Sequence, residues 1–149
     1  MSKRVLVPSV IGLVTLGALT AGGYAMASTA TQPTVENGTA GYTAPSQRGE
    51  GKLSFTADVS DDSGVREVRV VAWPASSELD PTESELRYVD EAECRSTSDE
   101  TSHCAYTLKV TRQDAADLAE GTWHVSVLAT AKDGGTTFVP RAATFDVTR

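Results

Sequence analysis

The sequence predicts an all-β domain, an antiparallel sandwich of about seven strands with one short helical turn. Between residues 52 and 149, apolar and polar residues alternate in several short runs, as in strands that bury one face. Turns rich in Gly and Asp separate these runs, and no alternation of strands with long helices is visible. Together these observations favour a sandwich of short strands over an α/β fold.

The first two strands of the domain are predicted on either side of a polar turn. Residues 53–59 alternate as a half-buried strand, and residues 60–64 (Ser-Asp-Asp-Ser-Gly) are a concentrated turn signal. Residues 65–73 form the second strand, which Pro74 ends. Because side chains alternate along a strand, Trp73 is expected on the face opposite Val68 and Val70, partly exposed.

Two cysteines, Cys94 and Cys104, lie in the middle of the domain. In an exported chain they are expected to form one disulfide, which staples a hairpin whose second strand includes residues 106–110. Closing so short a loop is worth about 2.5–3 kcal/mol in the chain-entropy estimate. A metal site with His103 is disfavoured, because it lacks a fourth ligand and the usual cysteine spacing. The preceding residues 86–89 suggest a short strand.

The C-terminal third begins with a short helix and ends with the longest alternating run. Thr111 is a suitable N-cap for a helix within residues 111–120, and Gly121 ends that turn. Residues 123–131 then alternate as a strand, and residues 132–135 (Lys-Asp-Gly-Gly) predict a tight turn into a return strand that ends the chain. The expected core consists of Leu53, Phe55, Val68, Val70, Tyr106, Leu108, Trp123, Val125, Val127, Phe138 and Phe145.

The N-terminal residues 1–27 have the pattern of a secretory signal peptide. Lys3 and Arg4 precede an apolar run over residues 5–23, and the small residues of Ala25-Met26-Ala27 fit cleavage after Ala27. An uncleaved membrane anchor is the alternative, since the run is nearly long enough to span a bilayer. Cleavage would release the remaining chain as a secreted protein.

Residues 28–51 are rich in Ser, Thr, Gly and Pro and have few large apolar side chains, which predicts a flexible linker before a domain over residues 52–149. Without Lys3 and Arg4, 11 basic residues remain against 20 acidic ones, a net charge of −9. This acidity argues against a nucleic-acid partner and against an anionic membrane surface, because both attract clusters of Lys and Arg.

Three segments resemble parts of bacterial immunoglobulin-like domains: residues 57–65, residues 118–123 and residues 129–135. They correspond in such modules to a strand–turn–strand, to the entry into the penultimate strand and to the last hairpin. The layout also resembles a family of uncharacterised small secreted proteins of actinobacteria. The resemblance implies an immunoglobulin-like sandwich over residues 52–149 and no known activity.

No set of residues with catalytic spacing is visible, so we expect a protein that is not an enzyme and needs no cofactor. The mature chain has only His103 and His124 as candidate bases, and neither lies in a nucleophile motif. Calcium is a weak candidate ligand, because the turns of Asp61 and Asp133 are expected at the same pole of a sandwich. The candidate calcium ligands are Asp58, Asp61, Asp62 and Asp133.

Two side chains are candidates for contacting a partner. Trp73 would stack on a polysaccharide if exposed, and Arg95 would anchor a disulfide-bracketed loop in a partner. The leading functional hypothesis is therefore an exported module that binds an extracellular protein or polysaccharide. The alternative is a small secreted protease inhibitor, using the loop within residues 95–103 or the loop within residues 74–81.

Overall fold

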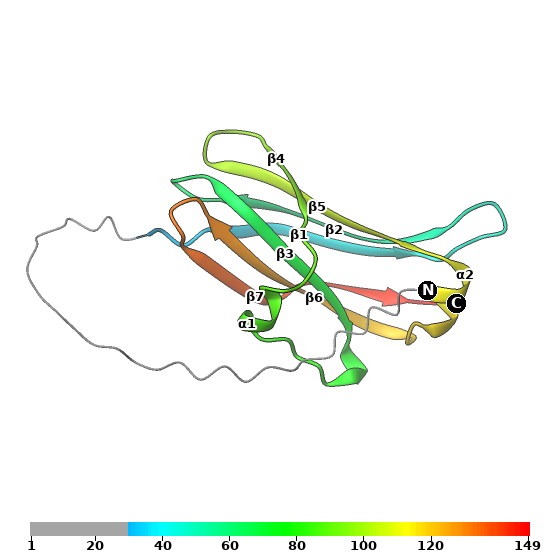
Figure 1. The fold of residues 1–149 in the computed structure, drawn as a ribbon. Coiled ribbons are helices and arrows are strands. Elements are labelled where there is room, and N and C mark those ends of the chain that lie inside the picture. Colours follow the sequence, from blue (N-terminus) through cyan, green and yellow to red (C-terminus); the bar gives the residue numbers. More distant parts are fainter. Residues whose placement is uncertain (1–29) are drawn as a thin grey trace, which may run out of the picture.

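A computed structural model describes residues 30–149, and the predicted signal peptide, residues 1–27, lies outside this part. Seven strands form two antiparallel sheets, which confirms the predicted all-β sandwich (Figure 1). The strands are β1 (Thr34–Thr43), β2 (Gly51–Ser60), β3 (Val65–Pro74), β4 (Glu93–Ser96), β5 (Thr101–Val110), β6 (Gly121–Ala131) and β7 (Thr136–Val147). The helices are η1 (Ala75–Ser77), α1 (Glu83–Leu86) and α2 (Arg112–Asp117).

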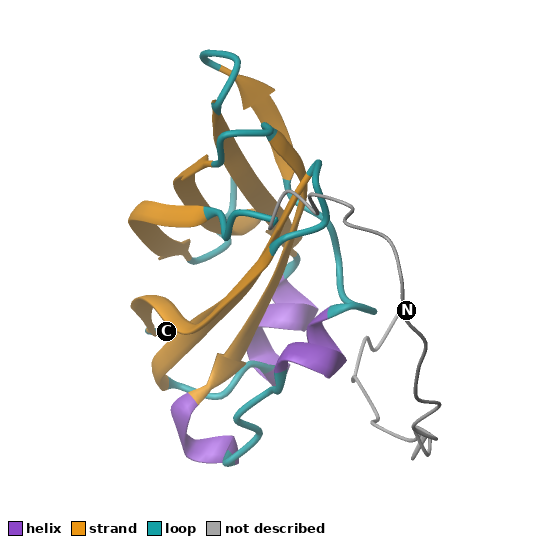
Figure 2. Cartoon of the chain, turned by 90° about the vertical axis from the view of Figure 1, so that its left-hand side faces the viewer, coloured by secondary structure: helices purple, strands orange, loops and turns teal. Residues whose placement is uncertain are grey.

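The strand order is β1-β2-β5-β4 in the four-stranded sheet and β3-β6-β7 in the three-stranded sheet. Lettered A to G along the chain, the two sheets have the strand orders ABED and CFG, an order that constant-type immunoglobulin sandwiches also have. The two layers are seen separately in Figure 2. This order places the β2–β3, β4–β5 and β6–β7 turns at one end of the sandwich, the loop end, and α2 at the opposite end.

The flexible linker predicted for residues 28–51 is wrong over most of its length, and the domain begins before residue 52. Strand β1 occupies residues 34–43 and pairs with β2 from Thr34↔Ser60 to Thr43↔Lys52. A bulge at Asn37 and Gly38 interrupts the register and brings β1 against β7. A Cβ atom on Gly38 would lie 2.5 Å from the Ala142 carbonyl oxygen, so only glycine permits this approach. Contacts with β2 and β7 keep β1 ordered, and the composition of the segment does not reveal these contacts.

The main core lies between the sheets and contains most of the predicted residues. Tyr106 only packs against its margin, and Leu108 is 44% exposed, which contradicts its predicted place in the core. Leu108 is exposed because β4 begins only at Glu93, opposite Ala105, and no described residues form a strand beside Leu108. The buried residues that were predicted are Leu53, Phe55, Val68, Val70, Trp123, Val125, Val127 and Phe145.

A second, smaller core covers the outer face of the three-stranded sheet. The segment predicted as a strand at residues 86–89 is instead the last residue of helix α1 and the turn that follows it. The helix has a capping box at Thr82. Leu86 is fully buried and packs with Val89 and Leu128, while Phe138 packs against this cluster instead of the main core. The spacing of Leu86 and Val89 by three residues is helical, and it allows both to face the sheet.

Helix α2 confirms the predicted helical turn. Thr111 is its N-cap, and the Thr111 hydroxyl accepts a hydrogen bond from the Asp114 backbone N–H, while the Asp114 carboxylate accepts one from the Thr111 N–H.

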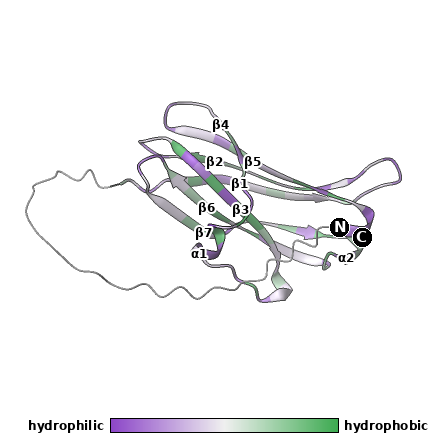
Figure 3. Ribbon diagram, viewed as in Figure 1, coloured by the Kyte–Doolittle hydropathy of each residue, from purple (hydrophilic) through white to green (hydrophobic). Residues whose placement is uncertain are grey.

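Figure 3 shows that hydrophilic residues gather on the turn between β1 and β2. Among the described residues, no helix has the length and apolar character needed to span a membrane.

Candidate functional site

The loop end of the sandwich carries a hollow of about 430 Å³. Three segments that are distant in the sequence form its walls: the chain before β1, the β2–β3 turn and the β4–β5 turn. Asp62 and Glu100 line the hollow and are exposed, so their charges face any molecule that enters it. The lining residues are Thr31, Gln32, Thr34, Ser60, Asp61, Asp62 and Glu100.

Asp61 and Asp133 come together at this end, as the positions of their turns predicted. The Thr31 hydroxyl donates to Asp61 Oδ2 at 2.8 Å, and the Thr31 backbone N–H donates to Asp133 Oδ2 at 3.0 Å. The Ser63 hydroxyl donates to Asp61 Oδ1 at 2.6 Å and accepts from the Asp133 backbone N–H at 3.1 Å. Each hydrogen bond joins two segments or closes a turn, so this network fastens the chain before β1 to two loops.

The hydrogen bonds keep both carboxylates ionised. Burial raises the pKa of Asp61, which is 5% exposed, but donation from Ser63 and Thr31 outweighs burial and lowers that pKa below its usual value. The pKa of Asp133 is lowered by the Gly135 backbone N–H and by Thr31. Both anions therefore persist at neutral pH as acceptors for fixed donors.

The calcium candidates are only partly brought together. Asp61 and Asp133 share the loop end but already accept from protein donors, and Asp58 lies on the outer face of the four-stranded sheet. Asp62 is exposed on its turn. Within residues 30–149, no group of three or more His, Cys, Asp or Glu side chains is arranged to hold a metal ion. Turn closure accounts for the network without a metal.

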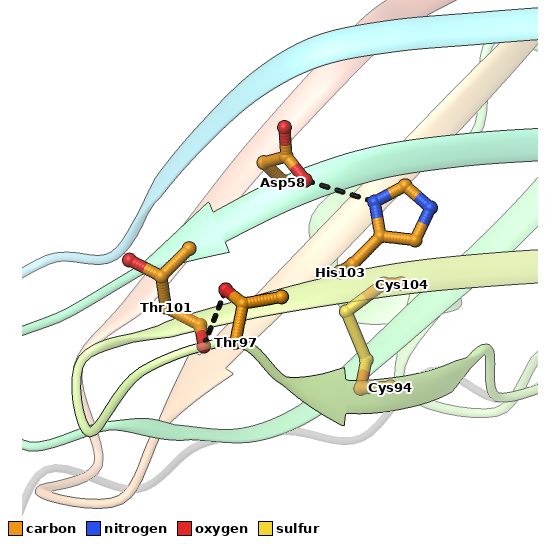
Figure 4. The surroundings of a disulfide bond; sticks show 6 residues. All are labelled: Asp58, Cys94, Thr97, Thr101, His103 and Cys104. Carbon is orange, nitrogen blue, oxygen red and sulfur yellow. Dashed lines mark hydrogen bonds and ion pairs between the residues drawn. A yellow bond between two sulfur atoms is a disulfide. The ribbon is translucent and has the colours of Figure 1, made fainter.

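The outer face of the four-stranded sheet is open and polar. The Nδ1 atom of His103 lies 2.9 Å from Asp58 Oδ1 (Figure 4). The Asn37 side chain donates to Asp58 Oδ2 at 3.0 Å. The hydrogen bond with His103, and then that from Asn37, lower the pKa of Asp58. Arg95 lies opposite His103 in the β4–β5 register, so one polar row crosses all four strands.

The predicted disulfide joins Cys94 to Cys104 and staples the β4–β5 hairpin (Figure 4). The two cysteines are direct cross-strand partners, with Cα atoms 4.0 Å apart. Arg95 belongs to strand β4, so it is not the protruding tip of a constrained loop. The tip consists of residues 97–100, where the Thr97 and Ser98 N–H groups donate to the Thr101 carbonyl oxygen.

Trp73 is buried, which contradicts its predicted partial exposure. Its side chain faces away from the main core as expected, but only 3% of the residue is exposed. The Trp73 indole N–H donates to Ser126 Oγ at 2.9 Å, and Ser126 Oγ donates to the Pro140 carbonyl oxygen at 2.8 Å. The ring also lies against His124, with centroids 4.8 Å apart. Trp73 is therefore part of the fold and is unable to stack on a polysaccharide in this structure.

Sequence reasoning missed Thr31 and the organising role of Ser63. Thr31 lies in a polar stretch without a motif, so nothing in the sequence distinguishes it from its neighbours. Ser63 was identified only as one letter of a turn signal. An Asp-x-Ser pattern followed by Gly was the one available hint, because Asp side chains commonly accept from the residue two positions later.

The comparisons with known proteins give one match. Residues 35–129 match a family described as a family of unknown function (DUF5707). Neither the curated proteins nor the solved structures yielded a match. The matched residues run from the second residue of β1 to near the end of β6, so they include almost all of β1, the acidic segment with α1 and the disulfide hairpin. The chain belongs to this family of unknown function.

Proposed function

We propose that this protein is an exported, non-enzymatic immunoglobulin-like module that binds an extracellular protein through its loop end. The observation that carries the proposal is the hollow at that end, whose walls are fixed by the network of Thr31, Asp61, Ser63 and Asp133. A surface held in place before binding loses little entropy on association. In immunoglobulin sandwiches, the same end carries recognition loops.

Export is supported by the leader pattern and by the disulfide. Disulfides persist in oxidising compartments and are rare in the cytosol, so Cys94–Cys104 is compatible with a secreted protein. The proposal places cleavage after Ala27. Mass spectrometry of the protein from culture medium is expected to give a chain that starts at Ser28. A chain that retains residues 1–27 in the membrane fraction would contradict release.

The partner is inferred to present a basic surface. Asp62 and Glu100 line the hollow, and Asp99 lies on the adjacent turn. Complementary charge chiefly improves the rate and specificity of association. A polysaccharide partner has less support than a protein, because the aromatic candidate Trp73 is buried.

The test is a pull-down from the producer's culture fluid with the protein and two charge-reversed variants. Asp62→Lys with Glu100→Lys changes the hollow without touching the Thr31 network. Asp117→Lys with Glu120→Lys makes the same change in charge at the opposite end. The proposal expects one specific protein that is captured by the wild type and by the second variant but lost with the first. Equal capture by both variants, or no specific capture, would reject the loop end as the binding surface.

The alternative of a protease inhibitor has less structural support. Arg95 lies within a strand, and in the second candidate loop, Glu78 and Asp80 have φ values of 55° and 34° on either side of the exposed Leu79. That backbone is curled, whereas a chain that enters a protease as a substrate-like strand is extended. Titration of secreted proteases with the protein tests this alternative directly. Stoichiometric inhibition would replace the binding-module proposal.

A further inference from the structure

Asn37 is the only asparagine in the chain, and Gly38 follows it directly. An Asn-Gly pair is prone to deamidation, because glycine has no side chain to hinder access to its backbone nitrogen. That nitrogen attacks the amide carbon of the asparagine side chain and closes a five-membered imide ring. The pair therefore marks a place where this chain has the chemical groups needed to modify itself.

The two residues lie where the strand ladder is interrupted. The β1–β2 register passes from Glu36 to Thr39, so Asn37 and Gly38 have no partners on β2. Both residues are exposed, and Asn37 has a φ of 55°, in the left-handed region that asparagine enters more readily than most residues. Ring closure fixes the ψ and χ1 angles of Asn37 but leaves its φ angle free. The observed φ is therefore no obstacle to the reaction.

Asp58 restrains the reactive side chain. The Asn37 Nδ2 atom donates to Asp58 Oδ2 at 3.0 Å, and the other carboxylate oxygen, Asp58 Oδ1, lies 2.9 Å from His103 Nδ1. This hydrogen bond holds the Asn37 amide toward β2, whereas ring closure requires the side chain to fold back on the backbone that follows it. The contact with Asp58 therefore slows the reaction.

We propose that Asn37 deamidates spontaneously in the folded protein and that its hydrogen bond to Asp58 sets the rate. The Gly38 nitrogen loses its proton to solvent and bonds to Asn37 Cγ, the Cγ–Nδ2 bond breaks, and Nδ2 leaves as ammonia. Water then opens the imide at either carbonyl, which gives aspartate or isoaspartate at position 37. The whole reaction consumes one water molecule and releases one ammonia molecule.

Both products disturb the contacts of β1 with its neighbours. In the aspartate product, a carboxylate replaces the donor to Asp58, so two carboxylates face each other at the distance of a hydrogen bond. In the isoaspartate product, the backbone is longer by one carbon just before Gly38. That glycine already lies so close to Ala142 of β7 that a Cβ atom would stand 2.5 Å from the Ala142 carbonyl oxygen. Deamidation therefore weakens the attachment of the first strand.

The test incubates the purified, disulfide-bonded protein at neutral pH and follows Asn37 by peptide mass spectrometry. The conversion of the Asn37 amide to an acid is expected, with both aspartate and isoaspartate as products. Asp58→Ala removes the acceptor and should raise the rate by about tenfold or more, the factor that a hydrogen bond to a charged group contributes. Thr56→Ala is the matched control, because Thr56 lies two residues earlier on the same face of β2; its rate should equal that of the wild type.

Two variants at position 37 test the consequence. Asn37→Gly permits the same φ, adds no charge and has no amide to lose, whereas Asn37→Asp has the charge of the product. Asn37→Asp is expected to melt at a lower temperature than Asn37→Gly, and equal melting temperatures would overturn the weakened attachment of β1. Deamidation in the folded state is overturned if Asn37 converts in the urea-denatured chain but not in the folded one. Equal rates in Asp58→Ala and Thr56→Ala would overturn the control by Asp58.

Discussion

The two sheets of this sandwich differ in what covers their outer faces. The outer face of the three-stranded sheet is covered by residues 82–92, and Leu86 and Val89 are buried against Leu128. Within residues 30–149, no comparable segment covers the outer face of the four-stranded sheet, and a polar row that includes Asp58 and His103 crosses it. The covered sheet has become a second core, whereas the open sheet is joined to its edge strand by a disulfide.

The comparison shows that a segment rich in acidic residues can cover one face of a sheet. Residues 82–93 contain five acidic side chains, at positions 83, 85, 90, 91 and 93. Two apolar side chains attach this segment to the sheet, together with Arg69, whose guanidinium donates to the Val89 carbonyl oxygen at 2.9 Å. Backbone hydrogen bonds also pair the end of the segment with β3, from the Val70 N–H to the Asp90 carbonyl and from the Ala92 N–H to the Val68 carbonyl. The acidic residues then form the outside of the cover.

The largest expected effect is on the cover. Leu86→Ala removes a fully buried side chain and should lower the free energy of unfolding by about 2–5 kcal/mol. Leu79→Ala is the matched control, because Leu79 lies in the loop just before this segment and is 54% exposed; it should change stability by less than about 0.5 kcal/mol. Urea denaturation measures both. Similar losses in the two variants would mean that Leu86 does not seal the sheet.

The next effect concerns the Cys94–Cys104 disulfide of the four-stranded sheet. The double variant Cys94→Ala with Cys104→Ala should have a free energy of unfolding about 2.5–3 kcal/mol lower than the wild type, because the disulfide no longer constrains the unfolded chain. Reducing agent should lower the melting temperature of the wild type but leave the double variant unchanged. A variant as stable as the oxidised wild type would show that hydrogen bonds alone hold β4 in place.

A smaller effect is expected from the buried hydroxyl that links the covered sheet. Ser126→Ala leaves the Trp73 N–H and the Pro140 carbonyl without their hydrogen-bond partner and should cost about 1–3 kcal/mol. Ser54→Ala on the open face is the control and should stay within about 0.5 kcal/mol. Thermal unfolding followed by tryptophan fluorescence compares the two. If Ser126→Ala and Ser54→Ala were equally stable, the hydrogen bonds of Ser126 would contribute nothing to the stability of the covered sheet.

The smallest effect is expected from the contact between Asp58 and His103 on the outer face of the four-stranded sheet. Asp58 has a lowered pKa in the folded state, so its contribution to stability is present above the usual pKa near pH 4 and is lost as the pH falls through the folded pKa. His103→Ala removes the main cause and should return the pKa of Asp58 toward its usual value. NMR titration of the Asp58 carboxyl carbon measures this shift. An unchanged pKa would assign the lowering to Asn37.

Alternation along the chain was enough to predict the strands that bury one face against the main core. Residues 53–59 and 123–131 lie where the pattern placed them. Strand β1 escaped prediction because its residues are small and polar, and their order depends on β2 and β7. Trp73 escaped because a pattern gives the direction of a side chain but not what covers it.

The candidate site was predictable only in outline. The topology of a sandwich places the turns of Asp61 and Asp133 at one end, and the structure confirms this position. Their partner Thr31 was beyond prediction, because it lies 102 residues from Asp133 in the sequence and no local pattern marks that contact. Contacts of this kind follow from the folded chain as a whole.

The seam between β1 and β7 has a consequence for how the chain reaches its folded state. The Thr137 hydroxyl donates to the Pro33 carbonyl oxygen across 104 positions of sequence, and Gly38 lies against Ala142. The first strand therefore has no neighbour on this side until the last strand has been made. The ladder between β1 and β2 involves neighbouring strands, whereas this seam joins the two ends of the domain and is the contact that waits longest for its second partner.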